Sequence, residues 1–521
     1  VDCIVVNCAS CGLTLKKDKY SIGEKLISNT FYLFLDWVTI AFFSFIFWSV
    51  TAKFLNDRDL VGIVSTSINF TILVYGFSTL GMISALKKLV PEIRKTKGKK
   101  GLYSLAKISI KPVLVSLLII SLILFSFSSQ LSVLVNIPTY AFILTTLSII
   151  SIFIFDFFGS IIYGLQNMKL LLLTDAAQII LRIILTIFLI LIGLSYLGPL
   201  TAFLLAYFLI SIFRFSPEYI KSRQKSISYK KLFSYAIPAL IALFSTSIIL
   251  NGQYIILSSL QSIEDTGIFT IAFTLSSMIA MLSHVLASAL FPIISSLSVE
   301  RKTKRRQGYL IGIILRYSLF LIIPLSALLM IFSKHIILIY SAPRFLLATS
   351  YLPILIPASI LYGLGTIFLV HIYAIGKPKL QRDIMILSAL CFLIISPLLT
   401  NYFSVLGISL SFFLIMSLRF SLGLKYIRKY LKIELFLKDN FKIFLSSFTI
   451  AFISLLFRSF ISNIFILILF LIPISLAYFF LLFIFKFYRI EDIKILIYFG
   501  KRIPFGGKYI LSIANFVKNK L

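Results

Sequence analysis

The stretch YAFILTTLSIISIFIFDFFGSIIY, from Tyr140 to Tyr163, contains one charged side chain, Asp156, in 24 residues. A helix of about 20 apolar residues crosses the hydrocarbon core of a bilayer, and only helices or closed barrels satisfy their backbone groups in lipid. Because the apolar run is continuous and does not alternate with polar residues, it predicts a transmembrane helix and excludes a barrel strand.

The whole chain of 521 residues shares this character, with 60% apolar and 13% charged residues. Soluble domains average about 45–50% apolar and about 25% charged residues, so a soluble fold is excluded. Apolar stretches long enough to span a membrane occur at 28–50, 61–86, 112–131, 140–163, 170–194, 197–213, 235–257, 267–291, 310–332, 351–373, 384–400, 402–424, 443–457 and 464–485. We therefore predict an all-α polytopic membrane protein with 14 transmembrane helices.

Lysine and arginine are concentrated on one side of the predicted helices. The net charge is +32, and 42 of the 50 Lys and Arg residues fall in the amino-terminal segment and in every second loop, against 5 in the opposite loops. Since cations accumulate in short cytoplasmic loops, we expect a multi-pass protein of the plasma membrane with both termini in the cytoplasm. The charge excess is thus a topology signal, and we expect no nucleic-acid partner.

The two ends of the chain lie outside the predicted helices. Residues 1–27 lack the apolar region and cleavage site of a removable signal peptide, so the first transmembrane helix is expected to direct insertion. Cys3, Cys8 and Cys11 are too few for a tetrahedral zinc site, and their role stays open. Residues 486–521 alternate basic and apolar side chains, which predicts an interfacial helix on anionic membrane lipids.

Two short motifs recur in the sequence and indicate an internal repeat. The segment NDRDLVG at 56–62 reappears as SIEDTG at 262–267, with an offset of 205 between the glycines. The segment YGLQNMK at 163–169 is echoed by YAIGKPK at 373–379, with an offset of 210. Two echoes at nearly one offset, with equal numbers of predicted helices around them, predict two halves of six helices each.

The repeat determines the expected domain organisation. Because six is an even number, both halves insert in the same orientation and their pseudosymmetry axis runs along the membrane normal. We expect bundles at 28–213 and 235–424, joined by a basic cytoplasmic linker at 214–234 and followed by two additional helices within 443–485. A substrate path between the two bundles is the natural expectation.

Polar side chains inside the predicted helices are the first candidates for a binding site. A charged side chain at mid-helix costs about 2.5–3.5 kcal/mol, so it is expected to face protein or water. Arg182 and Arg316 offer planar forks that suit a phosphate or carboxylate group. Asn69, Asn251 and Gln178 lie on polar stripes, which predict either a wet cavity or polar packing between helices.

Acidic side chains inside the helices form a second candidate group. Asp36, Asp156 and Asp175 could each bind a coupling ion, H⁺ or Na⁺. The structural alternative is that these acids pair with the buried arginines and lock the helices together. The sequence leaves both readings open.

Support for an enzymatic function is weak. The chain contains no Walker loop, GxGxxG, HExxH or GxSxG motif, so we expect no cofactor. Asp57-Arg58-Asp59 is a D-x-D motif of the kind with which glycosyltransferases hold a divalent metal ion. The outer loops are too short to build an acceptor site, so we interpret the motif as the first turn of a helix, where acidic side chains are favourable. A membrane glycosyltransferase or polymerase is the enzymatic alternative.

Several segments together resemble the multidrug, oligosaccharidyl-lipid and polysaccharide (MOP) exporter superfamily, most closely its polysaccharide-transporter branch. The matching stretches are 56–62, 81–91, 164–169, 291–292, 340–348 and 376–379. The arginine-rich amino-terminal cavity of the lipid II flippases has no clear counterpart in the sequence, which argues against the peptidoglycan precursor as cargo.

The resemblance implies both a fold and a function. The implied fold is MATE-like, with two pseudosymmetric six-helix bundles and two carboxy-terminal helices. The implied function is that of a monomeric flippase without enzymatic activity, which moves a polyprenyl-phosphate-linked oligosaccharide or polysaccharide precursor from the inner to the outer leaflet by alternating access. The alternative within the superfamily is a cation-coupled multidrug antiporter.

Overall fold

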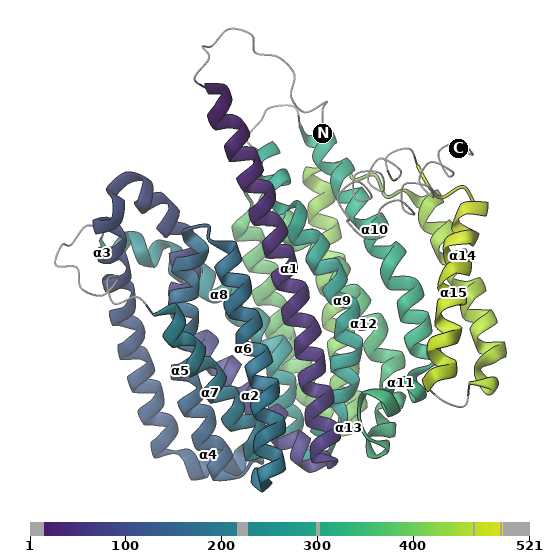
Figure 1. The fold of residues 1–521 in the computed structure, drawn as a ribbon, viewed down its shortest axis with the longest axis horizontal. Helices are drawn as coiled ribbons and strands as arrows, with labels where there is room; N and C mark the ends of the chain where they lie inside the picture. Colours follow the sequence, from purple (N-terminus) through teal and green to yellow (C-terminus); the bar gives the residue numbers. More distant parts are fainter. Residues whose placement is uncertain (1–14, 216–227, 299–302, 462–463, 490–491, 493–521) are drawn as a thin grey trace. The chain divides into compact units, whose positions relative to one another are not determined.

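The computed structural model describes residues 15–215, 228–298, 303–461, 464–489 and 492, and every regular element in these ranges is a helix (Figure 1). The first half contains α1 (Leu15–Leu55), α2 (Arg58–Ser78), α3 (Met82–Ser126), α4 (Ser128–Leu134), α5 (Thr139–Gly164), α6 (Met168–Leu189), η2 (Ile190–Leu194) and α7 (Leu197–Arg214). The second half contains α8 (Tyr229–Leu260), α9 (Ile263–Leu297), α10 (Lys304–Ile331), α11 (Ser333–Tyr340), η4 (Pro343–Ser350), α12 (Leu352–Ala374), α13 (Pro378–Tyr430), α14 (Leu437–Phe457), η5 (Arg458–Phe460) and α15 (Ile464–Ile484). Cys3, Cys8, Cys11, most of the linker 214–234 and most of the tail 486–521 lie outside the described residues.

Thirteen helices of the described chain are long and apolar enough to cross a membrane. One of them, α13, has 53 residues, a length of about 80 Å against a hydrocarbon core of about 30 Å. Its path is broken at Ser404, where φ is 49° and ψ is −129°, two residues after the start of the predicted helix 402–424 and close to its boundary with the predicted helix 384–400. The prediction of an all-α polytopic membrane protein is confirmed, and the predicted count of 14 helices is compatible with the structure.

The turn between α5 and α6 has the same backbone geometry as the turn between α12 and α13. The amides of residues 165–167 donate to the carbonyls of residues 161, 163 and 162, and the amides of 375–377 donate to those of 371, 373 and 372. The middle residues, Gln166 and Gly376, both have positive φ, at 60° and 80°. The three hydrogen bonds recur at an offset of 210, which agrees with the motif echo in the sequence.

A second pair of turns also matches, and its sequences share the short pattern S-x-L-G, at 195–198 and at 404–407. Ser195 has φ 46° and ψ −131° between η2 and α7, and Ser404 has nearly the same angles 209 positions later. Three residues after each serine, Gly198 and Gly407 approach the backbone of the preceding helix so closely that a Cβ would meet a backbone nitrogen at 3.1 Å and 2.7 Å respectively. The two parts of α13 therefore correspond to α6 and α7.

The packing divides the chain into two units. One unit comprises the described residues up to Phe47 together with Ser67–Gly252, and the other comprises Trp48–Thr66 together with the described residues from Gln253 onward. The ends of α1 and α2 thus group with the second unit, whereas most of α8 groups with the first. The boundaries of the two packing units therefore differ from those of the two sequence repeats.

Gly62 and Gly267 are the glycines of the first repeated motif. Within the second unit, each packs against the start of the helix that carries the other. A Cβ on Gly62 would lie 2.9 Å from the carbonyl carbon of Ile263, and a Cβ on Gly267 would lie 2.9 Å from that of Arg58. Arg58 and Ile263 are the first residues of α2 and α9, so the repeat relates the two contacts to each other. Small residues permit such close helix approach.

We expect Gly62→Ala and Gly267→Ala each to lower the free energy of unfolding by about 1–3 kcal/mol, because the added methyl group meets backbone that cannot rotate away. Gly76→Ala, also in α2, is the matched control, since its Cβ would lie 3.8 Å from the nearest atom, Ser247 Oγ. Alanine in place of a helical glycine is otherwise favourable by about 0.5–1 kcal/mol. Thermal unfolding in detergent measures the difference, and equal melting temperatures for Gly62→Ala and Gly76→Ala would contradict the close contact.

One predicted transmembrane helix, 61–86, is interrupted in the structure. The helix α2 ends at Ser78, and α3 begins at Met82 after Gly81 adopts φ 72°. A Cβ on Gly81 would lie 2.9 Å from the carbonyl carbon of Ala236. The close approach of α8 is thus the physical reason for the break, and it cannot be inferred from local hydropathy.

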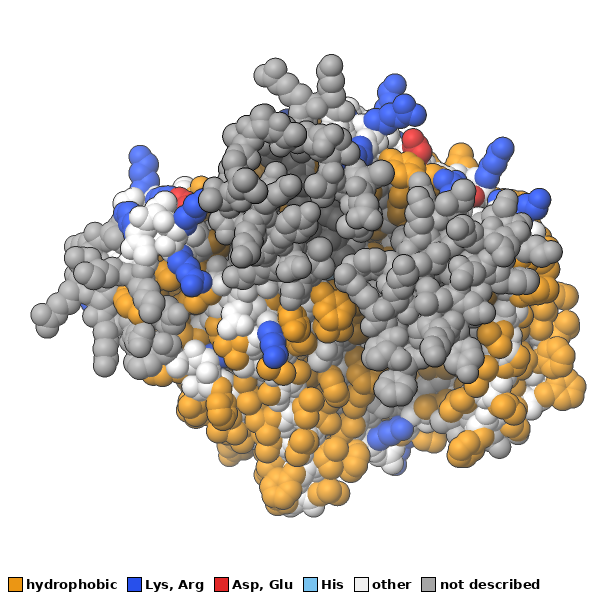
Figure 2. Space-filling view, turned by 45° about the horizontal axis from the view of Figure 1, so that its top comes forward, with side chains coloured by type: hydrophobic (Ala, Val, Ile, Leu, Met, Phe, Trp, Pro, Cys, Tyr) orange, Lys and Arg blue, Asp and Glu red, His pale blue; other side chains and the backbone are white. Residues whose placement is uncertain are grey.

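Large apolar side chains are exposed along the helices. Figure 2 shows a hydrophobic surface over the described helices, with most of the visible Lys and Arg side chains gathered toward one end of them. On α14, Phe444, Phe448 and Phe452 follow one another at one-turn spacing and are 50%, 70% and 56% exposed. Such a surface is unfavourable in water but natural in lipid. The chain is a multi-pass membrane protein.

Candidate functional site

Three acidic side chains gather inside the first unit, as a cluster drawn from α1, α5 and α6. Asp36 is 6% exposed and lies within hydrogen-bonding reach of Asp175. Tyr75 of α2 donates to Asp156 Oδ2 at 2.6 Å, and Asp156 lies close enough to Asp175 to interact with it electrostatically. The structure thus brings the three predicted coupling candidates together.

Arg214, in the last turn of α7, supplies a cation to this cluster. Its Nη2 lies 2.8 Å from Asp175 Oδ1, and the arginine side chain is 1% exposed. Its Nε and Nη2 donate to Thr174 Oγ1 at 2.9 and 2.5 Å, and its guanidinium carbon lies 3.6 Å from the centroid of the Phe155 ring. Gly159 makes room for the guanidinium, because a Cβ there would overlap Nη1. Arg214 is therefore a fixed partner of Asp175.

Sequence reasoning misses Arg214, because it directly follows the predicted helix 197–213 and is counted with the cytoplasmic linker. One signal could have found it. Arg214 lies seven residues after Tyr207 and hence on the same face of a continued helix. In the structure Tyr207 also contacts Phe155, with ring centroids 5.1 Å apart.

Arg182, in α6, is buried without an acidic partner in the described part of the chain. The residue is 7% exposed, and no carboxylate of the described residues pairs with it. Its guanidinium carbon lies 3.5 Å from the centroid of the Phe47 ring and 5.1 Å from that of Phe203. The stacked rings cover the face of the guanidinium, whereas its N–H donors point outward from its edge. Tyr207 lies close enough to interact with the guanidinium electrostatically, and the Nε of Arg182 has no hydrogen-bond partner among the described residues.

Gln178 lies one helical turn before Arg182 and is likewise a buried side chain with an unpaired donor among the described residues. It is 5% exposed, and its Nε2 has no hydrogen-bond acceptor among the described residues. The Nε of Arg182 also lacks an acceptor. Buried polar groups are normally paired, and each exception needs an explanation. Two neighbouring sets of donors without acceptors suit a ligand that brings acceptor oxygens.

The two asparagines predicted to bind substrate lie in the same unit. Asn69 of α2 is buried, with 8% of its surface exposed. Asn251 of α8 donates from Nδ2 to Ser247 Oγ at 2.8 Å, which agrees with the predicted polar stripe on that helix. Because the Asn251 amide already has an intrahelical partner, its contact with substrate stays a prediction.

Arg316, in the second unit, lies in a cluster of ion pairs and not on a free face. Its Nε lies 3.0 Å from Asp439 Oδ2, and its Nη1 and Nη2 donate to the two carboxylate oxygens of Asp492 at 2.9 and 2.8 Å. Nη2 also donates to the carbonyl of Phe487 at 2.8 Å. All three nitrogens thus have protein partners, which differs from the expectation that Arg316 binds phosphate.

The physical reason is that α14 and the segment after α15 bring carboxylates to α10. Burial alone would raise the pKa of Asp492, but hydrogen bonds from Arg316 and Tyr317 outweigh that effect and hold the pKa below its usual value. Arg316 therefore joins three parts of the chain. The sequence places both acids in cytoplasmic segments and offers no sign of this pairing.

Arg419, in α13, is a buried arginine that the predicted site did not include. It is 3% exposed, its Nη1 has no hydrogen-bond partner among the described residues, and its guanidinium carbon lies 5.6 Å from the centroid of the Tyr362 ring. The second unit thus also contains a guanidinium with uncommitted donors.

The D-x-D motif forms the start of α2. Asp57 Oδ1 accepts a hydrogen bond from the Leu60 amide at 3.1 Å, and Asp57 Oδ2 lies 3.8 Å from Arg344 Nη1. Arg58 pairs with Glu264 of α9 at 2.6 Å. The motif therefore works as a helix cap and as part of an ion-pair network, as the sequence interpretation expected.

A model of the family described as "Polysaccharide biosynthesis protein" matches residues 26–298, which is more than half of the chain. The chain belongs to this family. No curated protein sequence matches it significantly.

Several solved transporter structures have similar folds. The lipid II flippase MurJ, in an inward closed conformation, matches with a TM-score of 0.69 and 18% identity over 88% of this chain and 98% of that chain. An inward-facing multidrug resistance MATE family transporter of the MOP superfamily matches at 0.57 and 17%, over 77% and 95% of the two chains. A MOP superfamily transporter from Pyrococcus furiosus matches at 0.56 and 15%, over 78% and 95%. The predicted MATE-like fold and the resemblance to this superfamily are confirmed.

The segment that the family model matches includes the residues of the candidate site in the first unit. The matched segment 26–298 contains the acid cluster with Arg214, and it contains Arg182 with Gln178. Arg316 and its partners lie beyond it. We therefore centre the candidate site on the first unit.

Proposed function

We propose that the protein is a flippase without enzymatic activity, which moves a polyprenyl-phosphate-linked oligosaccharide or polysaccharide precursor from the inner to the outer leaflet of the plasma membrane by alternating access. The observation that carries the proposal is the buried Arg182, which has no acidic partner in the described residues. In a polysaccharide biosynthesis family member, an anionic carrier phosphate is the ligand that such a group would serve. We place both termini in the cytoplasm and take the monomer as the working unit.

Arg182 and Gln178 suit the phosphate end of such a substrate. A guanidinium donates two parallel hydrogen bonds to phosphate oxygens, and charge-assisted bonds of this kind are about twice as strong as neutral ones. The aromatic rings against Arg182 hold its plane in place and reduce the freedom lost on binding. A glycan cannot cross hydrocarbon unaided, because its hydroxyl groups would lose their hydrogen bonds. A protein site that takes up the phosphate while shielding the glycan meets this requirement.

The acid cluster is our candidate for coupling. Asp36 Oδ1 is buried without a hydrogen-bond partner in the described residues, whereas Asp175 is already paired with Arg214. Binding of H⁺ or Na⁺ beside Asp36 would remove an uncompensated negative charge from the interior of the unit. This same cluster favours the second candidate function, a cation-coupled drug antiporter, because buried carboxylates also attract organic cations.

Reconstitution distinguishes the candidates. Proteoliposomes containing a fluorescent lipid-linked oligosaccharide would be given an H⁺ or Na⁺ gradient, and the label reaching the opposite leaflet would be read with an impermeant quencher. We expect Asp36→Asn to reduce gradient-driven transport about tenfold or more while transport down the substrate's own gradient persists, since the amide takes up no proton and lacks the negative charge that attracts Na⁺. Asp59→Asn, at an exposed acid, is the matched control.

The rival functions predict other results. Uptake of organic cations, lost in Asp36→Asn and with no movement of the lipid-linked sugar, would favour the antiporter. Metal-dependent transfer of sugar to an acceptor, lost in Asp57→Asn, would favour the glycosyltransferase. Gradient-driven transport by Asp36→Asn at the rate of the unsubstituted protein would reject Asp36 as the coupling residue.

A further inference from the structure

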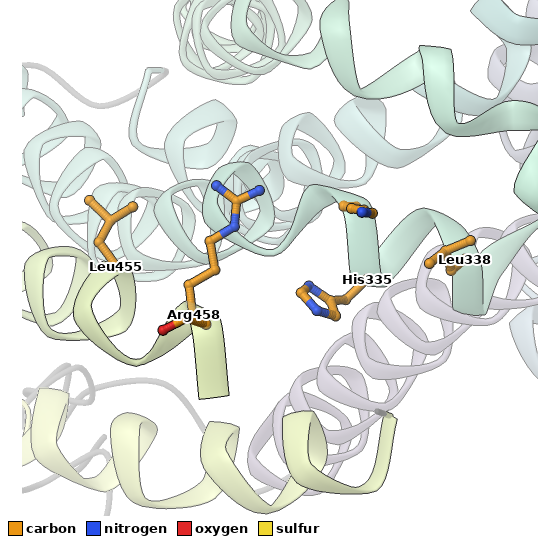
Figure 3. A pocket seen from close by; sticks show the side chains of 6 residues that line it. His335, Leu338, Leu455 and Arg458 are labelled. Atoms are coloured by element: carbon orange, nitrogen blue, oxygen red, sulfur yellow. The ribbon is translucent and has the colours of Figure 1, made fainter. Parts of the chain in front are cut away.

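A basic pocket opens in the second unit, at the ends of α10 and α14. The cavity has a volume of about 590 Å³ and is lined by Lys334, His335, Leu338, Leu455, Arg458 and Ser459. Figure 3 shows the side chains of Arg458 and His335 reaching into it from opposite sides. The lining includes no Asp or Glu, so its positive charge is not compensated within the pocket.

The basic groups come from segments far apart in the sequence. Lys334 and His335 lie in the first turn of α11, and Arg458 begins η5 after α14. The sequence assigns only five cations to the loops on this side of the membrane, and Lys334 and Arg458 are two of them. Their convergence on one pocket is therefore not a consequence of a generally basic surface. The amino end of α11 adds a favourable dipole for an anion.

The walls of the pocket are held in place by protein contacts. His335 Nε2 donates to the carbonyl of Ile461 at 2.8 Å, which ties α11 to the segment after η5. Behind this bond Ile331, Phe332, Ile461 and Leu467 form a buried apolar cluster. The segments that carry Lys334 and Arg458 are thus tied together, and a ligand need not order the walls when it binds.

One side of the pocket is apolar and continuous with the lipid-facing surface. Leu338 and Leu455 are 38% and 52% exposed, and Phe457 and Phe460 beside Arg458 are 48% and 72% exposed. A soluble anion would gain nothing from these side chains. A molecule with an anionic head and an apolar chain would satisfy both sides of the pocket, since burying apolar surface contributes about 25 cal/mol per Å².

We propose that this pocket binds the phosphate group of a membrane lipid between Lys334 and Arg458, with the acyl chains of the lipid along Leu338 and Leu455. The site is separate from Arg182, which lies in the other unit, and it goes beyond the proposed transport function. A lipid held there would bridge α11 and η5 and so support the attachment of the last two transmembrane helices.

Native mass spectrometry of the full chain in detergent tests the proposal, with phosphatidylglycerol and phosphatidylcholine as probes. The double variant Lys334→Gln/Arg458→Gln is expected to retain phosphatidylglycerol at least about tenfold less well, through loss of charge-assisted bonds to phosphate. The double variant Lys53→Gln/Arg344→Gln is the matched control, because it removes the same charge from loops on the same predicted side. We expect the control to retain the lipid like the unsubstituted protein.

Competition with inorganic phosphate distinguishes a lipid headgroup from a free phosphate ion, since both offer phosphate oxygens to the pocket. At millimolar concentration we expect it to leave bound phosphatidylglycerol in place, because it lacks the acyl contacts. Displacement at that concentration would overturn the assignment to a lipid. Equal retention of phosphatidylglycerol by the pocket variant and its control would overturn the site itself. The substituted side chains are exposed, so unchanged melting temperatures are expected to show that both variants fold.

Discussion

Arg182→Ala is expected to reduce the initial rate of lipid-linked oligosaccharide transport about 100-fold or more while leaving the protein folded. The loss follows from removal of two charge-assisted hydrogen bonds to phosphate, each worth about 1.5–3 kcal/mol. Stability is expected to stay the same or rise, because the substitution removes a buried cation and leaves no unpaired acid behind. The measurement is transport in proteoliposomes, with the melting temperature taken in parallel.

Arg182→Lys is the matched control for this prediction. Lysine keeps the charge but presents a point donor in place of a planar fork, and it stacks less well on the rings of Phe47 and Phe203. We expect transport between that of the unsubstituted protein and that of Arg182→Ala. Unimpaired transport of the natural lipid-linked sugar by Arg182→Ala would reject the role of Arg182.

Arg316→Ala is expected to have the opposite profile, lowering the free energy of unfolding by about 3–5 kcal/mol. The substitution leaves Asp492, whose side chain is only 8% exposed, buried without its cation. Asp439, 7% exposed, loses one partner but keeps Arg489 Nη2 at 2.8 Å. Thermal unfolding in detergent and the yield of folded protein are the measurements. The part that detaches first is expected to be α14 and α15, because the ion pairs join them to α10.

The exposed pair of Arg382 and Asp383 provides the control for Arg316. Its nitrogen and oxygen also lie 2.8 Å apart, but the side chains are 34% and 58% exposed, and exposed pairs contribute about 1 kcal/mol or less. Arg382→Ala should therefore change the melting temperature little. If Arg316→Ala melted like Arg382→Ala yet lost transport, Arg316 would belong to the substrate site after all.

The fold could be predicted from the sequence to the extent that it depends on local patterns. Apolar runs of membrane-spanning length predict helices wherever they occur. The repeat shows where glycine permits a close helix contact, as at Gly62, or a turn with positive φ, as at Gly376. The matched turns at Ser195 and Ser404 share only the pattern S-x-L-G, which is too short to indicate a repeat without the backbone angles. The break after Ser78 depends on the approach of α8, which hydropathy does not report.

The sequence predicts most residues of the candidate site, but it does not predict which of them pair with one another. Asp36 and Asp175 are evident as acids within apolar helices, and the cost of burying them indicates a role. Their arrangement around Arg214 depends on helix packing, and Arg214 itself lies at a helix boundary, where sequence-based assignments are least certain. Arg316 pairs with Asp492 across 176 positions of sequence, a separation that no local pattern spans.

The central claim is that the phosphate of a lipid-linked glycan binds at Arg182. A polyprenyl-diphosphate sugar with a photoreactive group beside the diphosphate tests it directly, through crosslinking in proteoliposomes and sequencing of the labelled peptides. The account predicts labelling of α6 around Gln178 and Arg182, and loss of that labelling in Arg182→Ala. Labelling confined to other helices, and unchanged by Arg182→Ala, would contradict it.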